Sequence, residues 1–412
     1  MAPTKTVVVL GAGVAGLSLA HFLVSRILPE QPDLRVVLVS PLTHFYFNLA
    51  SVRFVLPGRG PPMAEDRYLF PIAERFAGYP HADRFRFIAG AATSLHPESN
   101  SVTVKPNDEA KEEEIAYHTL VIATGTSYAG GMPWKALGST DQTRAAVAQL
   151  QSQIGSASSI VVGGAGATGV EFSGELGAAY AKKGLKKITL LSADPLPLEP
   201  RLKDSVRQTA KKELEKLGVE FVGGARMVSV TPAAGGSGSS SDKDKKDIAI
   251  EVTSADGKTK TTKTVTADLF VPTYGVVYNT SFAPPSMHSP ASPGRLLQDP
   301  DLRARGHRNV FVLGDAGSLE PAQAVTAEAQ ARHLMKQFRT YLAGGTIETY
   351  YTPAKDKVMF GLTVGPDRGT GQVGTFQPPS LLIWWLKGRY LGTNHAANYA
   401  AGIGSSNGAW PK

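Results

Sequence analysis

Two glycine-rich turns are the part of this sequence best suited to chemistry. Each follows an apolar run and opens a helix-like stretch, and its glycines have the spacing G-x-G-x-x-G. They are Gly11, Gly13 and Gly16 in the first turn and Gly164, Gly166 and Gly169 in the second. In such a turn the first glycine permits the bend, the second lets the backbone approach a pyrophosphate, and the third lets the helix pack closely on the strand. Two copies in one chain predict two bound dinucleotides, as hydride transfer from a nicotinamide to a flavin requires.

Other residues of each unit extend the two predicted sites. Val14 and Ala15 belong to the first turn, where we expect FAD, and Thr168 belongs to the second, where we expect NAD(P)H. The second strand of each unit ends in a serine, Ser40 or Ser192, where a carboxylate usually holds a ribose hydroxyl. A serine binds that hydroxyl without adding charge. The second site therefore does not repel a 2′-phosphate, and both NADH and NADPH remain open as donors.

Two residues are expected near the nicotinamide. Glu171, one turn into the helix after the second glycine turn, is a candidate contact to the nicotinamide ribose or amide. The alternative for Glu171 is an acid that offsets the positive end of the helix dipole. Gly275 follows a strand that returns toward the flavin, and we expect it to border the nicotinamide.

A later segment completes the predicted FAD site. Residues 309–316 form a short apolar strand that ends in Gly314 and Asp315, and a carboxylate at this place can accept a ribityl hydroxyl. The helical pattern of residues 322–342 begins beside it, so the amides of Ala324 and Val325 would stabilise negative charge on the reduced ring. The alternative is a surface turn in which Asp315 caps a helix.

The composition limits the chemistry that side chains can supply. The 412 residues include no cysteine, which excludes the dithiol reductases and the cysteine-dependent sulfide oxidisers that share a two-dinucleotide plan. The nine histidines show no ligand spacing, so we expect no metal site. Any electron transfer must therefore run through the cofactors.

Charge and hydropathy suggest where the protein resides. The net charge of +8 owes much to lysines of residues 242–247 and 258–263, a composition typical of a solvated loop, so nucleic-acid binding is not expected. No apolar run reaches the roughly 18 residues that a membrane span needs. Few residues precede the first strand, so we expect no signal peptide and a cytoplasmic rather than secreted protein.

The order of these patterns predicts an α/β fold with two Rossmann-like dinucleotide-binding domains and a small C-terminal α+β cap. We expect a split FAD-binding domain of residues 1–126 and 269–344, and an inserted NAD(P)H-binding domain of residues 127–268. The glycine- and serine-rich residues 233–247 are expected to form a flexible hairpin loop on the inserted domain. Residues 345–412 would form the cap.

With both glycine turns, Ala123-Thr124-Gly125 and Gly314-Asp315 in this order, the chain resembles the pyridine nucleotide-disulphide oxidoreductase-like flavoproteins over nearly its full length. More narrowly, it resembles their apoptosis-inducing-factor-like and ferroptosis-suppressor-like branch, through residues 44–53, 190–218 and 361–374. The resemblance implies that Ala123, Thr124, Gly125, Asn48 and Arg53 contact FAD. The acid that this branch has at the strand end is missing at Ser40, and Met1-Ala2 lacks the glycine that myristoylation requires.

The resemblance also implies NAD(P)H:quinone oxidoreduction on a membrane surface, such as the mitochondrial outer face or a lipid droplet. Residues 381–386 are apolar and include Trp384 and Trp385, and Lys387 and Arg389 follow, as in elements that lie at a membrane interface. An ordinary domain core is the alternative for this segment. Two other functions stay open: reduction of a protein acceptor such as a ferredoxin, and a redox-sensing effector that binds nucleic acid. The sequence does not indicate an oligomeric state.

Overall fold

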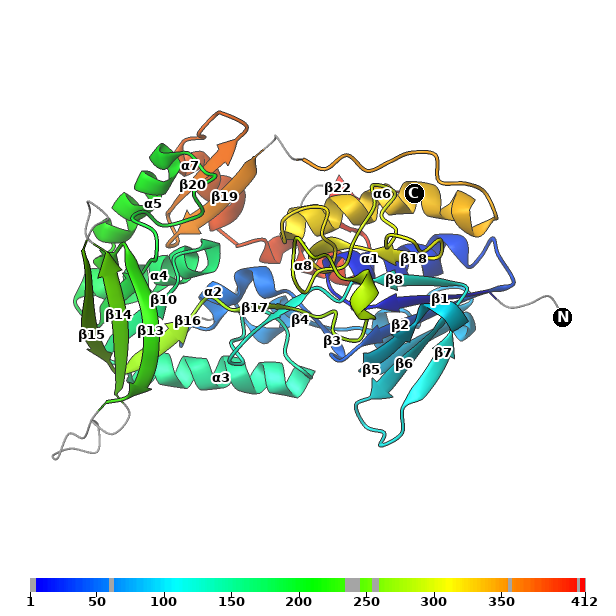
Figure 1. Cartoon of the computed structure of the whole chain (residues 1–412), viewed down its shortest axis with the longest axis horizontal. Coiled ribbons are helices and arrows are strands. Elements are labelled where there is room, and N and C mark those ends of the chain that lie inside the picture. Colours follow the sequence, from blue (N-terminus) through cyan, green and yellow to red (C-terminus); the bar gives the residue numbers. More distant parts are fainter. Residues whose placement is uncertain are drawn as a thin grey trace.

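Two sheets with mainly parallel strands, each with its own glycine turn, form the two halves of the molecule (Figure 1). The computed structural model describes residues 5–58, 63–233, 245–253, 259–354, 358–405 and 408–411. Within these residues no helix has the length and apolarity to cross a bilayer.

The first sheet has seven strands. In spatial order they are β18 (Val310–Val312), β8 (Thr119–Ile122), β1 (Lys5–Leu10), β2 (Leu34–Ser40), β5 (Phe85–His96), β6 (Ser101–Pro106) and β7 (Glu113–Ala116). The strands from β18 to the first part of β5 run parallel. Because β18 comes late in the chain and pairs with β8, the chain returns to its first sheet after forming the second.

Both faces of this sheet are buried, which explains why β1 is a continuous apolar run. Val7 and Val9 pack on the face covered by α1 (Val14–Phe22) and α6 (Ala324–Leu342), whereas Val8 and Leu10 pack with Phe282 on the other face. Helix α1 continues into a π-helical turn, Leu23–Ile27. Figure 1 shows α6 lying along α1.

Strand β5 is longer than its sequence predicts. The alternating pattern indicates a short strand at residues 85–88, whereas the observed strand has 12 residues. Its first part pairs with β2 in parallel, and its second part, from Gly90, pairs with β6 antiparallel. The second part is rich in small residues, so the hydrophobic alternation fades while the backbone ladder continues.

The second sheet has four parallel strands: β12 (Val219–Val222), β11 (Lys187–Leu191), β10 (Ser159–Gly163) and β16 (Leu269–Pro272). Helices α4 (Ala167–Ala179) and α5 (Asp204–Lys216) pack on it. An antiparallel sheet of β13 (Ala225–Pro232), β14 (Lys246–Thr253) and β15 (Lys260–Ala267) covers its other face, where Val161 and Leu191 meet Ile248 and Ile250. Most of the predicted flexible loop, residues 234–244, lies outside the described residues; Lys246 and Asp247 belong to β14.

Short elements join the two halves. Strands β9 (Thr126–Tyr128) and β17 (Val276–Tyr278) pair with each other where the chain passes between the sheets. Helix α3 (Thr140–Ser156) follows β9 and begins at Ser139, whose Oγ accepts a hydrogen bond from the amide of Gln142. Strands β3 (His44–Tyr46) and β4 (Leu69–Pro71) pair beside the short helix α2 (Ser51–Phe54).

The C-terminal residues contact both halves. The hairpin of β19 (Met359–Val364) and β20 (Arg368–Val373) packs against α4 and α5 on one side and against α7 (Ser380–Ile383) on the other. A π-helical turn, Trp384–Gly388, continues α7. Helix α8 (Thr393–Ala400) packs on α1, and the short strands β21 (Gly404–Ser405) and β22 (Gly408–Ala409) follow.

Candidate functional site

The first glycine turn has the geometry of a pyrophosphate cradle. Gly11 has φ +99°, a left-handed conformation that favours glycine, and a Cβ there would overlap the carbonyl of Ala123. A Cβ at Gly16 would overlap the carbonyl oxygen of Gly11, so this glycine lets α1 approach the turn. Gly13 has no heavy atom within 4 Å of its would-be Cβ and precedes the positive N-terminus of α1. The open space at Gly13 thus lies in front of the helix N-terminus, where an anionic phosphate would bind.

A cavity of 680 Å³ extends from this turn along the carboxyl ends of the first sheet's strands. The predicted FAD-contacting residues that line it are Gly11, Gly13, Val14, Ala15, Ser40, Asn48, Ala123, Thr124, Gly125, Gly314, Asp315 and Ala324. Gly16, Arg53 and Val325 are not among its lining residues: Gly16 packs inside the turn, and Val325 lies one residue beyond Ala324 on α6. A long ligand fits here, because the lining comes from elements far apart in the sequence that meet at one sheet edge.

Polar groups in the cavity offer partners for a ribityl or ribose chain. Asp315 Oδ2 accepts hydrogen bonds from Thr126 Oγ1 (2.9 Å) and Lys135 Nζ (3.1 Å). Thr124 Oγ1 is buried and has no hydrogen-bond partner among the residues that the structure describes, so a ligand hydroxyl could bond to it. No pattern in the sequence points to Lys135, because it lies far from Asp315 along the chain, with most of the second nucleotide-binding region between them.

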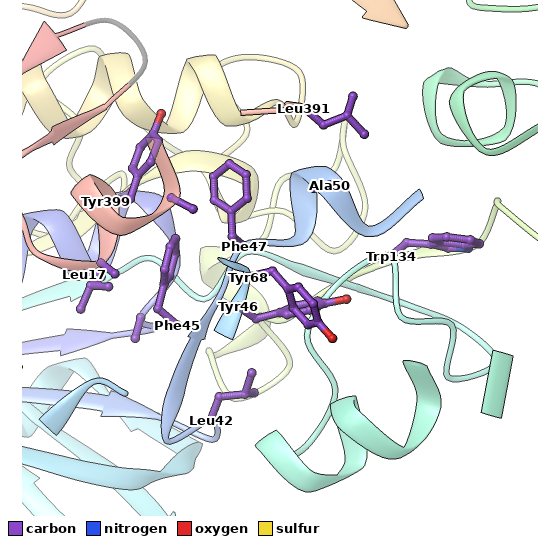
Figure 2. Packing of buried hydrophobic residues seen from close by; sticks show 14 of the residues in the cluster. Leu17, Leu42, Phe45, Tyr46, Phe47, Ala50, Tyr68, Trp134, Leu391 and Tyr399 are labelled. Carbon is purple, nitrogen blue, oxygen red and sulfur yellow. The ribbon is translucent and has the colours of Figure 1, made fainter. Parts of the chain in front are cut away.

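The segment from His44 to Ala50 lies beside the cavity, which His44, Tyr46, Asn48 and Leu49 line. Figure 2 shows Phe45, Tyr46, Phe47 and Ala50 of this segment packed among other buried side chains. Burial raises the pKa of the Tyr46 hydroxyl well above its usual value, so it keeps its proton and donates to the carbonyl of Pro133 (2.6 Å). Phe47 packs against Tyr399 of α8, with ring centroids 6.0 Å apart. Asn48 Nδ2 donates to the carbonyl of Trp134 (2.9 Å). These side-chain contacts add to the backbone pairing of β3 with β4, so neighbours on both sides fix the segment.

The second glycine turn repeats the geometry of the first. Gly164 has φ +96°, a Cβ at Gly169 would overlap the carbonyl of Gly164, and Gly166 again has open space around it. Gly166 precedes the N-terminus of α4, which is free to face an anionic phosphate. Ser192 is buried at the end of β11, and its Oγ lies 3.5 Å from the carbonyl of Leu196.

The two predicted sites lie close to each other. Tyr128 lines the first cavity, and its hydroxyl lies 3.5 Å from Thr168 Oγ1 at the start of α4. Gly275, with φ +83°, accepts a hydrogen bond from the amide of Ala129 next to Tyr128. Val277 lines the cavity and is 48% exposed. A nicotinamide held by the second turn would therefore find an apolar opening at the first cavity.

Glu171 and Arg53 both lie at the junction between these sites and the C-terminal cap. Glu171 Oε1 pairs with Lys387 Nζ (2.8 Å) and accepts a hydrogen bond from the amide of Thr363 on β19 (3.2 Å). Arg53 Nε and Nη2 donate to Glu175 Oε1 on α4 (2.9 and 2.6 Å), and Nη1 donates to the carbonyl of Gly388 (2.9 Å). Both groups are therefore held by protein partners in this structure, and their contacts to cofactors stay predictions.

Among the described residues, no group of three His, Asp or Glu side chains is arranged to hold a metal ion. The histidine that lines the cavity, His44, has its pKa lowered by partial burial and by the nearby charge of Arg144.

The family model described as pyridine nucleotide-disulphide oxidoreductase matches residues 5–331, a range that includes both glycine turns and Asp315. The chain belongs to this family. FAD and NAD(P)H are accordingly its cofactors, and it is an NAD(P)H-dependent flavoprotein oxidoreductase, as the paired glycine turns predicted. This chain contains no cysteine, so it cannot form the redox disulfide that the family is named for.

Individual relatives extend this similarity over nearly the whole chain. The chain is 35% identical to oxidoreductase ptaL of Pestalotiopsis fici over 92% of its length and 94% of that protein. It is 27% identical to ferroptosis suppressor protein 1 of Xenopus tropicalis over 89% of its length and 88% of that protein. A type II NADH:quinone oxidoreductase of Staphylococcus epidermidis is 28% identical over 52% of this chain and 51% of its own length. The predicted resemblance to ferroptosis-suppressor-like flavoproteins is thereby confirmed.

The solved structure of NDH2 from Plasmodium falciparum in complex with NADH has the same fold, with a TM-score of 0.69 at 13% identity. The superposition covers 93% of each chain. The predicted fold, with two Rossmann-like dinucleotide-binding domains and a C-terminal cap, is confirmed.

Proposed function

We propose that this oxidoreductase passes electrons from NAD(P)H to a quinone dissolved in a membrane, and that α7, with the turn that continues it, docks on that membrane. The observation that carries this proposal is the surface of α7 and the turn that continues it. Leu381, Leu382, Trp385 and Leu386 are 62%, 42%, 68% and 66% exposed. Ile383 is buried against the hairpin. A short helix with one buried and one open apolar side suits the boundary between headgroups and acyl chains.

The π-helical turn that continues α7 contacts α2, which lies beside the FAD cavity. The last residue of this turn, Gly388, accepts a hydrogen bond from Arg53 on α2. One turn earlier in the chain, Asn48 and Leu49 line the cavity, and Leu49 is 36% exposed. A hydrophobic acceptor that enters the cavity from this side would meet the apolar side chain of Leu49 at its wall. The name of the type II NADH:quinone oxidoreductase of Staphylococcus epidermidis, which is similar to about half of this chain, supports a quinone acceptor.

The residues of this chain bind and orient the cofactors, and we assign no nucleophile. The open amides at Gly13 would hold one pyrophosphate and those at Gly166 the other. Asp315, held by Lys135 and Thr126, would accept a ribityl hydroxyl, and the N-terminus of α6 at Ala324 would support negative charge. Once bound, FAD supplies the chemistry that accepts a hydride from NAD(P)H and releases the electrons to the acceptor.

Donor choice follows from Ser192. The side chain there is neutral and buried, so it adds no repulsion toward a 2′-phosphate. We therefore propose that the enzyme accepts both NADH and NADPH.

The double variant Trp385→Ser, Leu386→Ser tests the membrane and quinone assignment. It should bind neutral and anionic vesicles less well than the unchanged protein and reduce a long-tailed quinone in vesicles more slowly, because the open apolar side is lost. Reduction of ferricyanide, which needs no membrane, should stay unchanged, as should flavin content. Val228→Ser is a matched control, because Val228 is 65% exposed on β13, away from this helix.

Two outcomes would overturn the proposal. If the double variant reduces both acceptors equally slowly and loses flavin, then this segment only supports the fold. If the unchanged protein reduces ferricyanide but no quinone of any tail length, the acceptor belongs to another chemical class.

A further inference from the structure

A second cavity, of 420 Å³, lies between the C-terminal hairpin and the ends of two helices of the second nucleotide-binding region. It shares no lining residue with the FAD cavity. Its lining residues are Lys182, Glu213, Lys216, Leu217, Val364, Pro366, Asp367, Arg368, Leu381 and Trp384. The two nucleotide sites leave this cavity unexplained.

The cavity carries more positive than negative charge. Three cations line it, Lys182, Lys216 and Arg368, against two carboxylates, Glu213 and Asp367. Glu213 is already paired with Lys216 (2.7 Å). Among the described residues, Lys182 has no ion-pair partner, and Arg368 donates only to the backbone carbonyl of Asp367 (2.8 Å). Two cations are therefore available to an anion, with one carboxylate beside them.

The same cavity borders the exposed apolar side of α7. Leu381 forms part of its wall and is also 62% exposed, on the helix that carries Trp385 and Leu386. Trp384 forms the adjoining wall. An amphipathic helix in a bilayer lies about 5–10 Å deep, at the boundary between headgroups and acyl chains. Cations at its rim would then lie at the level of the lipid phosphates.

We propose that this cavity binds the phosphate headgroup of an anionic phospholipid while α7 lies in the bilayer surface. The inference rests on the membrane docking proposed above and names the lipid that the dock recognises. Arg368 offers a planar pair of donors to phosphate oxygens, and Lys182 adds a point charge from the turn that follows α4. The negative charge of Asp367 weakens the binding of an anion. The cavity therefore favours a headgroup with a single negative charge, on a membrane that is rich in such lipids.

The test measures co-sedimentation of the flavin-loaded full chain with phosphatidylcholine vesicles, with and without phosphatidylglycerol. The variant Lys182→Glu, Arg368→Glu should bind the anionic vesicles roughly tenfold less tightly or worse, since each cation near such a surface contributes about 1 kcal/mol. Its binding to neutral vesicles should not change. Asp367→Asn should strengthen binding to the anionic vesicles.

A control separates a specific cavity from surface charge in general. Lys105→Glu, Lys263→Glu makes the same charge change at exposed positions on β6 and β15. This control should lose much less binding than the cavity variant; an equal loss would overturn the proposal. Flavin content and ferricyanide reduction show that each variant is folded.

Further outcomes distinguish this inference from the docking on which it rests. Equal binding of the unchanged protein to neutral and anionic vesicles would overturn the headgroup site and leave the docking of α7 intact. Release of the protein from anionic vesicles by inorganic phosphate, at concentrations that leave the vesicle charge unchanged, is a further outcome to measure. That result would overturn the lipid assignment and indicate a site for a free anion. Absence of binding to either vesicle would overturn both proposals.

Discussion

The glycines of the first turn differ in what surrounds them. Gly16 has no room for a Cβ, because that atom would overlap the carbonyl of Gly11. Gly13 has open space and an extended backbone that any residue can adopt, with φ −79° and ψ −167°. A side chain at Gly13 would thus leave the protein fold intact and occupy the place of the pyrophosphate. Cofactor binding and folding can be separated within one turn.

We expect Gly13→Leu to fold normally and to lose most of its FAD, whereas Gly16→Leu should fail to fold stably. Flavin absorbance per mole of protein, with far-ultraviolet circular dichroism for the fold, measures both effects. Gly78→Leu is the control, because Gly78 is also exposed and also has no neighbour within 4 Å. Full flavin content in Gly13→Leu would show that the pyrophosphate lies elsewhere.

His21 is a buried, neutral side chain between α1 and α8. Its ring stacks on Phe76 at 4.1 Å, and its Nε2 lies 2.9 Å from the carbonyl of Ala400. A carbonyl only accepts, so Nε2 carries the proton, and Nδ1 accepts from the hydroxyl of Tyr79 (3.0 Å). Burial lowers the pKa of His21 from 6.5 to about 4.

This pKa predicts how stability depends on pH. Between pH 6.5 and about 4 the unfolded chain binds a proton at His21 that the folded chain does not, so stability falls as the pH drops through this window. Urea unfolding measures the drop in the free energy of unfolding between pH 7 and pH 4.5. This drop should be roughly 2–3 kcal/mol smaller for His21→Phe than for the unchanged protein. An identical pH dependence of the two proteins would contradict the burial of a neutral imidazole.

Cavity residues could be predicted from the sequence where their position follows from the spacing within one segment. Residues whose place depends on a partner far away in the sequence could not. The glycines of each turn and the Gly314-Asp315 strand end have fixed spacings to a strand and a helix, so a single segment reveals them. Lys135 meets Asp315 only when the chain has returned to its first sheet, and no spacing along the sequence predicts that contact. Arg53 and Glu171 were predicted as cofactor contacts; here, Glu175 and Lys387 hold them.

At the scale of elements, the glycines of the C-terminal hairpin have a packing role. A Cβ at Gly371 would lie 3.0 Å from Ile383 Cδ1 and 2.6 Å from the carbonyl of Phe360. A Cβ at Gly369 would lie 2.7 Å from Ile383 Cγ2. These glycines let α7 lie directly on β20, which turns the remaining apolar side chains of α7 outward. The sequence revealed the glycine-rich pattern and the apolar run, but which side of the run is buried depends on the hairpin beneath it.

Gly371→Ala should therefore displace Ile383 and lower the free energy of unfolding by roughly 1–3 kcal/mol, the usual cost of overpacking. Gly361→Ala is the matched control, because a Cβ there would lie 3.8 Å from the same Ile383 side chain, an ordinary contact distance. Thermal unfolding of both variants, followed by tryptophan fluorescence, measures the difference. Equal stability of the two would mean that α7 does not pack on the hairpin as described.

At the scale of the whole molecule, Arg53 joins the three parts of the chain. It lies on α2 beside the FAD cavity, and its side chain is only 7% exposed. It pairs with Glu175 of α4 and donates to the carbonyls of Gly388 and Arg389 at the end of the turn that continues α7. The sequence predicts the order of the three parts along the chain. How firmly they are held together depends on side chains such as this one.

Removing the guanidinium leaves a buried carboxylate with a lost partner, which typically costs about 3–5 kcal/mol. We expect Arg53→Met to lower the melting temperature and to broaden or split the calorimetric transition, because the contact it removes joins all three parts.

Arg305→Met is the control: Arg305 pairs with Asp299 at 2.9 Å, but its side chain is 60% exposed, so its loss should cost about 1 kcal/mol or less. The double variant Arg53→Met, Glu175→Met should recover much of the loss, since it also removes the buried carboxylate that Arg53 neutralises. A normal, sharp transition in Arg53→Met would mean that the parts are held together mainly by apolar packing, such as that of Phe47 against Tyr399.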